Sequence, residues 1–117
     1  MIVTTSTLCL IPTAFFPTYS ATKAFLHSWL QSHHQLRTSP VEVLELVPSY
    51  VRTGLTGPRQ ASDPRGMSVD DFVSEVLGLL EAEDHPAGEI LVERARIERS
   101  AERSGGYETV SATMNPA

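Results

Sequence analysis

The sequence contains a single cysteine, Cys9, and no segment typical of an exported or membrane-spanning protein. One cysteine excludes an internal disulfide and fits a reducing compartment, so we expect a cytoplasmic location. No apolar stretch approaches the roughly 18–20 residues that a membrane span needs. Met1 opens directly onto a strand-like run, without the basic flank of a signal peptide. These absences predict a chain with no membrane partner.

Positive charge is also scarce in this chain. Lysine and arginine number 9 against 14 acidic residues, which gives a formal net charge of −5. No cationic field is therefore available to attract nucleic acid or anionic lipid. The 117 residues allow one domain, and their 41% hydrophobic and 20% charged content is ordinary for a soluble globular protein. Beside a predicted strand, Cys9 is expected to be a small buried side chain and not a nucleophile.

The most informative stretch is YSATK, from Tyr19 to Lys23. A tyrosine and a lysine four residues apart on a helix lie on one face, about 5–6 Å from each other. A neighbouring ammonium group favours the phenolate form of a tyrosine, and such a tyrosine can act as a general acid or base. The spacing alone has low specificity, because an ordinary exposed helix face can also present this pair.

Strand-like runs stand on both sides of this stretch. Residues 2–6 form a short β-branched run that ends in Ser6, and Val41 to Val47 form a second run that Pro48 stops. The helix expected from about Pro17 to Leu36 would connect them as a parallel βαβ unit. The sequence therefore predicts an α/β fold, a partial Rossmann-like parallel sheet of at least two strands with flanking helices.

The order of these motifs resembles the catalytic half of a short-chain dehydrogenase/reductase. The resemblance is closest over residues 2–57, and residues 89–115 are more loosely similar to members described as DltE-like oxidoreductases. It implies NAD- or NADP-dependent hydride transfer between a carbonyl and an alcohol, with a small molecule as substrate. It also implies a catalytic βαβ unit at 1–57, a substrate loop at 54–66 and a helical tail at 68–117.

The resemblance assigns three catalytic residues. Tyr19 would exchange a proton with the substrate oxygen, and Lys23 would hold the nicotinamide ribose and favour the tyrosine's charged form. Ser6 would hydrogen-bond the substrate oxygen where negative charge develops. The role of Ser6 is open to an alternative, because three neighbouring threonines also carry hydroxyl groups: Thr4, Thr5 and Thr7.

The resemblance also implies cofactor contacts by Tyr19 and Lys23 and by the turn after the second strand, from Pro48 through Val51 to Thr53. In this turn Ser49 stands where the family usually has glycine. No Gly-rich turn follows a first strand, although the pyrophosphate of a dinucleotide binds at such a turn. We therefore expect the N-terminal cofactor-binding half to be absent and NAD(P) to bind weakly or not at all.

This expectation leaves other functions open. The chain could be a catalytically inactive truncated fragment, or an interaction module that keeps the dimerisation helix. An epimerase of the extended family also uses Tyr-x-x-x-Lys, but the short tail after Thr53 argues against it. The helix has a wide apolar arc that includes Phe25 and Trp29, so we expect a homo-oligomer through helix 19–36.

The remaining segments carry weaker signals. Residues 7–18 form an apolar loop expected to lie over a cleft or against a partner, and residues 54–66 a mobile loop. Ser68 should cap a helix, residues 90–92 form a possible third strand, and residues 94–103 a solvated helix. The four histidines lack a carboxylate at helical spacing, and we expect no metal site.

Overall fold

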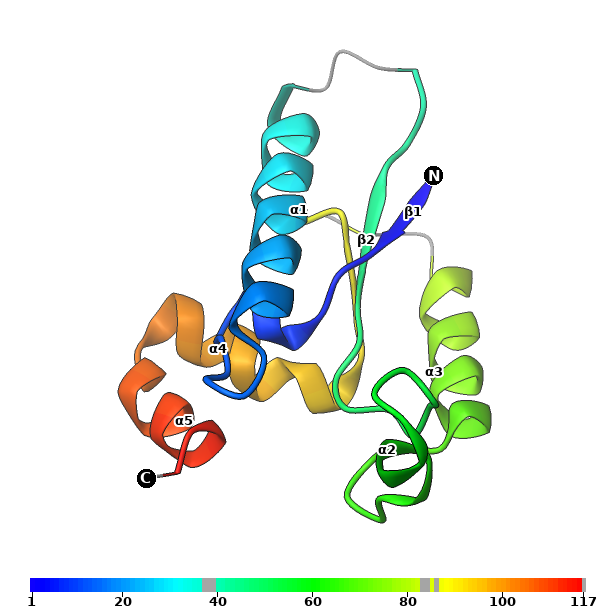
Figure 1. The fold of residues 1–117 in the computed structure, drawn as a ribbon. Helices are drawn as coiled ribbons and strands as arrows, with labels where there is room; N and C mark the ends of the chain where they lie inside the picture. Colours follow the sequence, from blue (N-terminus) through cyan, green and yellow to red (C-terminus); the bar gives the residue numbers. More distant parts are fainter. Residues whose placement is uncertain (37–39, 83–84, 86, 117) are drawn as a thin grey trace.

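The computed structural model describes residues 1–36, 40–82, 85 and 87–116 of the chain. Three short strands form one parallel sheet in the order β1 (Ile2–Thr4), β2 (Leu44–Val47) and β3 (Glu89–Leu91) (Figure 1). The predicted α/β, Rossmann-like class is confirmed. Within the described ranges, helical segments surround this sheet: η1 (Thr7–Cys9), α1 (Pro17–Leu36), α2 (Pro58–Ser62), α3 (Val69–Glu81), η2 (Glu93–Ala95), α4 (Arg96–Ser104) and α5 (Tyr107–Met114).

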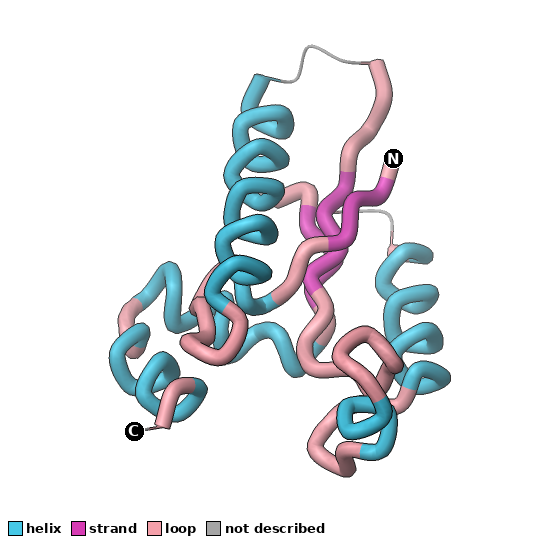
Figure 2. The backbone as a smooth tube through the Cα atoms, viewed as in Figure 1, coloured by secondary structure: helices cyan, strands magenta, loops and turns pink. Residues whose placement is uncertain are grey.

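The long helix α1 connects β1 to β2, and its predicted bounds are confirmed. Figures 1 and 2 show α1 and α3 on either side of the sheet. Leu30 of α1 is buried, whereas Phe25 and Trp29 remain 72% and 47% exposed. The apolar face of α1 is thus wider than the part of it that this chain buries. Neither α1 nor another helix in the described part is long and apolar enough to cross a bilayer.

The core lies at the carboxyl end of the sheet, where the segments that leave the strands meet. It joins Leu10 and Ile11 from the loop after β1 to Val47, Val92 and Ala101. The loop predicted to lie over a cleft or against a partner therefore supplies core residues. Phe15 and Phe16 in its outer part are exposed, and a partner for them stays a prediction.

The C-terminal segment differs from its prediction in two respects. The third strand exists but begins one residue earlier, at Glu89, and pairs in parallel with β2. Helix α4 is not simply solvated, because Arg99 and Ala101 are buried in it. The Arg99 guanidinium bonds Glu89 on β3 and Glu102 on its own helix, which explains how a charged residue becomes buried.

A second helix, α5, follows α4 within the predicted helical tail at 68–117, but it was not predicted as a separate helix. Gly105 and Gly106 separate the two helices with φ values of 101° and 86°, in a region of backbone space that side chains other than glycine's rarely adopt. Two such residues in succession turn the chain sharply, so α5 packs back against α4 (Figure 1).

The segment between β2 and α3 is more regular than a mobile loop. It contains α2, which was not predicted because a five-residue helix that begins at Pro58 is too short to show a periodic pattern. The start of α3 is confirmed, since the Ser68 hydroxyl accepts a hydrogen bond from the Asp71 N–H at 3.1 Å. The predicted helix end at 84–86 falls partly outside the described residues, and α3 ends at Glu81.

Candidate functional site

The predicted site residues gather where β1 and β2 end. Ser6 follows β1, and Pro48 follows β2 on the neighbouring parallel strand. The Thr7 N–H donates to the Pro48 carbonyl at 3.1 Å, which joins the two segments just beyond the sheet. Figure 1 shows α1 beginning beside the chain that leaves β1. The carboxyl edge of the sheet and the first turns of α1 therefore form one region, the usual location of ligand sites in such folds.

Tyr19 and Lys23 lie on one face of α1, as their spacing predicted. The Lys23 Nζ is 5.6 Å from the centroid of the Tyr19 ring. It also donates to the Thr4 carbonyl at 3.0 Å, at the carboxyl end of β1. This bond fixes the ammonium group between the helix and the sheet edge. Both side chains are half-buried, so each keeps a surface that solvent or a ligand can reach.

Ser6 caps the short η1 segment. Its Oγ accepts a hydrogen bond from the Leu8 N–H at 3.2 Å, and the residue is 9% exposed. Accepting this bond leaves the hydroxyl proton free to donate. Thr5, one of the competing hydroxyls, instead donates to Glu45 Oε1 at 2.6 Å and is buried. Thr5 is thus directed into the protein, which leaves Ser6 as the better candidate of the two.

The turn from Pro48 to Thr53 is held by a residue that the sequence analysis did not single out. The Gln60 side-chain amide donates to the Val51 carbonyl at 2.9 Å and to the Thr53 Oγ1 at 3.2 Å. Its oxygen accepts from the Thr56 hydroxyl at 2.6 Å. Gln60 is buried on α2. The proposed cofactor-contacting turn is therefore anchored from within the segment predicted to be mobile.

A second anchor in this segment is ionic. Arg65 bonds the Asp63 carboxylate through its guanidinium and its backbone N–H, and these bonds hold the pKa of Asp63 well below its ordinary value. The Tyr50 hydroxyl donates to the same carboxylate at 3.1 Å. Desolvation, together with this hydrogen bond, raises the pKa of Tyr50. Noncovalent side-chain contacts thus connect Tyr50, Asp63 and Arg65 within this segment.

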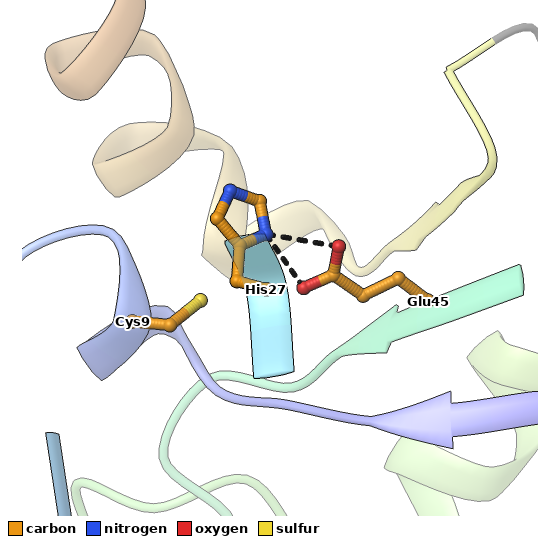
Figure 3. Close-up of side chains that lie close together, drawn as sticks. All are labelled: Cys9, His27 and Glu45. Carbon is orange, nitrogen blue, oxygen red and sulfur yellow. Dashed lines mark hydrogen bonds and ion pairs between the residues drawn. The ribbon is translucent and has the colours of Figure 1, made fainter. Parts of the chain in front are cut away.

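A third cluster lies in the interior of the protein, and the sequence analysis did not predict it. The His27 Nδ1 donates to both oxygens of Glu45, at 2.8 and 2.9 Å, and both residues are buried. Cys9 lies beside them, and one donor atom from each residue falls within 4.8 Å of the others (Figure 3). Glu45, the partner of His27, lies on β2 and not on α1. A search for carboxylates at helical spacing from the histidines could therefore not find it. A lone glutamate within the apolar run VLELV was the available signal.

The Cys9 thiol does not have the character of a nucleophile. Burial raises its pKa to about 11, and the nearby charge of Glu45 acts in the same direction. Because the thiolate is the reactive form, the expectation that Cys9 is not a nucleophile agrees with the structure. Cys9 also lines a pocket of ≈ 560 Å³ whose other walls include Leu8, Pro12, Ser20, Ala24 and Asn115.

Lys23 places an ammonium group at the carboxyl end of β1, and the Thr53 hydroxyl lies in the turn that Gln60 holds. A pyrophosphate needs a glycine turn that leads from a strand directly into a helix. Among the described glycines, those with positive φ do not directly follow a strand; they are Gly57, Gly88, Gly105 and Gly106.

The fold and the site thus define an α/β chain with a tyrosine–lysine pair at the carboxyl edge of a parallel sheet. The chain is similar to DltE of Bacillus subtilis (strain 168), which is described as an uncharacterized oxidoreductase. The two are 40% identical over 116 residues, which cover 95% of this chain and 44% of DltE. The chain therefore spans less than half the length of this relative. No protein-family model matches the chain, and no solved structure matches it significantly.

Proposed function

We propose that this chain carries the proton-transfer and substrate side of an oxidoreductase of the short-chain dehydrogenase/reductase type. The observation that carries the proposal is the Lys23 ammonium group, fixed 5.6 Å from the Tyr19 ring centroid and bonded to the Thr4 carbonyl. The similarity to DltE supports redox chemistry of a general kind. The substrate class that fits is a small carbonyl compound or its alcohol.

In this proposal each residue has one task. Tyr19 donates its proton to the carbonyl oxygen during reduction and takes it back during oxidation. Ser6 donates a hydrogen bond to the same oxygen, where negative charge develops in the transition state. Lys23 would bind the ribose of the cofactor, while Thr53 would hold the carboxamide end together with Pro48 and Val51. A bound nicotinamide, as NAD or NADP, would supply or accept the hydride.

The positioning of these groups depends on local structure that the fold supplies. Ser6 is fixed because it caps η1, and Thr53 is fixed by Gln60. These fixed positions matter because correct orientation of the reacting groups can lower the activation barrier by about 7–11 kcal/mol. The proposal therefore makes Gln60 a positioning residue of the cofactor-contacting turn.

The 117-residue chain by itself is expected to bind NADH and NADPH weakly or not at all, and not to reduce carbonyl compounds. The physical reason is that the described residues offer no helix-terminus anion site for the pyrophosphate. Calorimetric titration with both cofactors, together with an absorbance assay over a panel of carbonyls, measures this. Micromolar binding that Lys23→Met abolishes would contradict the expectation.

The same proposal includes a second copy of the chain as a partner for α1. Phe25 and Trp29 form an exposed aromatic surface on this helix, of a kind that monomers tend to avoid when it is extensive. Analytical ultracentrifugation at high micromolar concentration is expected to show a dimer, and the double change Phe25→Ser/Trp29→Ser to shift it toward monomer. Phe15→Ser is the control, because Phe15 is equally exposed but lies outside α1. A compact monomer of the unaltered chain would rule this interface out.

The catalytic proposal is tested in a fusion protein. The portion of DltE outside the aligned region is joined to residues 1–117, and the product is assayed with NADH and NADPH over the carbonyl panel. Turnover that depends on Tyr19 supports the proposal. A correctly folded fusion that binds cofactor but reduces none of the panel, or does so equally without the Tyr19 hydroxyl, contradicts it.

A further inference from the structure

We propose that Cys9, His27 and Glu45 together bind one divalent transition-metal ion, with Zn²⁺ as the best match. This inference is independent of the oxidoreductase proposal, because it concerns the interior between η1, α1 and β2. It also departs from the sequence-based expectation that the chain has no metal site.

The geometry is the first argument. The three residues come from three different elements, and Figure 3 shows their side chains converging. One donor atom from each lies within 4.8 Å of the others. Zinc bonds of about 2.0–2.3 Å bring tetrahedral ligand atoms to roughly 3.5 Å from one another. A pair at the 4.8 Å limit would therefore close by about 1.3 Å. The His27 Nδ1 and the Glu45 oxygens, now 2.8 and 2.9 Å apart, would instead separate by about 0.6 Å as the metal replaces their hydrogen bond.

The chemistry of the donor set is the second argument. Sulfur, imidazole nitrogen and carboxylate oxygen are the three protein ligands that zinc uses, and a set that mixes thiolate with imidazole disfavours Mg²⁺ and Ca²⁺. Binding of a divalent ion would release the Cys9 thiol proton to solvent, and the ion would then balance the thiolate and the Glu45 carboxylate in a neutral interior site. Glu45 is only 3% exposed, and a buried charge of this kind needs a counter-charge close by.

The surroundings of the cluster are the third argument. Thr5 donates to Glu45 Oε1 at 2.6 Å and would orient this ligand, as hydrogen-bonded neighbours do in metal sites. The His27 Nε2 is buried without a hydrogen-bond partner among the described residues. Ligation through Nδ1, the nitrogen that faces Glu45 in Figure 3, would replace the His27–Glu45 hydrogen bond and move the ring proton to Nε2.

The pocket beside Cys9 offers a route for the metal ion and space for a fourth ligand. Cys9 is half-buried and lines the ≈ 560 Å³ pocket between η1, the start of α1 and Asn115. A metal ion could enter by this route, and a water molecule from the pocket could complete a tetrahedral site. Asn115 also bonds the loop at the pocket's rim, since it accepts from the Ala14 N–H at 2.6 Å and donates to the Pro12 carbonyl.

Titration with Co²⁺ tests the proposal, because a sulfur-to-cobalt charge-transfer band can arise only from Cys9, the one cysteine of the chain. The purified, reduced and chelator-treated 117-residue chain is expected to develop this band at one equivalent of Co²⁺ and to lose it on adding Zn²⁺. His27→Gln is expected to weaken Co²⁺ binding at least tenfold. His33→Gln is the matched control, since His33 lies on the same helix but stacks on Trp29 at the surface.

X-ray absorption at the zinc edge provides a measurement that needs no variant. The Zn²⁺-loaded chain is expected to show one sulfur at about 2.3 Å and the remaining ligands as nitrogen or oxygen near 2.0–2.1 Å. Absence of the cobalt band, absence of a sulfur neighbour of zinc, or equal Co²⁺ affinity in the folded His27→Gln and His33→Gln variants would each overturn the proposal.

Discussion

Replacing Tyr19 with phenylalanine in the fusion with the DltE portion is expected to lower kcat about 10²–10⁴-fold, which is the usual contribution of a positioned general acid. Phenylalanine keeps the ring beside the Lys23 ammonium group but has no proton to exchange. Cofactor binding should change little, because Lys23 and Thr53 are unaltered. Steady-state kinetics of carbonyl reduction, with cofactor affinity measured separately, gives both quantities.

Tyr107→Phe is the control for this change. Tyr107 opens α5 and is partly exposed, and it lies outside the candidate site. Its loss should leave kcat within about twofold, because surface substitutions away from special features have small effects. If Tyr19→Phe and Tyr107→Phe behave alike, the proton-transfer role of Tyr19 is wrong.

Replacing Arg99 with methionine is expected to lower the free energy of unfolding by about 3–5 kcal/mol, the usual cost of removing one partner of a buried ion pair. The side chains of Arg99 and Glu89 are only 6% and 9% exposed. Methionine would leave the Glu89 carboxylate in the interior with Arg103, at 3.6 Å, as its nearest cation. The loss is a large part of a total stability that is typically about 5–15 kcal/mol.

Urea denaturation measures this loss, and Arg96→Met is the matched control. Arg96 lies on the same helix and pairs with Glu93 at 2.7 Å, but both side chains are exposed. An exposed pair is worth about 0–1 kcal/mol. Equal losses for the two variants would mean that the Arg99 pair does not support the packing of α4 on β3.

Local signals in the sequence predicted the helices well where those signals were strong. The bounds of α1 followed from Pro17 and a long periodic stretch, and the start of α3 followed from the Ser68 cap. The parallel strands were also predictable, because the β-branched runs flank a helix. Helices α2 and α5 were missed, since each is short and depends on contacts with the rest of the chain for its stability.

The Tyr19–Lys23 pair was predictable because its geometry depends on one helix. The His27–Glu45 bond, the Gln60 clamp and the Arg99–Glu89 pair were not, because each joins elements that are distant in sequence. For the same reason the solvated character predicted for residues 94–103 holds only in part, since Arg99 and Ala101 are buried. A charged residue at a helical position looks exposed until the strand that pairs with it is known.

Deuterium transfer is the most direct test of the catalytic proposal. The fusion protein is given reduced cofactor that carries deuterium at C4 of the nicotinamide ring, and the alcohol product is analysed by mass spectrometry. If Ser6, Tyr19 and Lys23 hold the substrate for hydride transfer, the product carries one deuterium on the former carbonyl carbon, and Tyr19→Phe forms it far more slowly. Solvent-derived hydrogen at that carbon, or labelled product formed equally fast by Tyr19→Phe, would contradict the account.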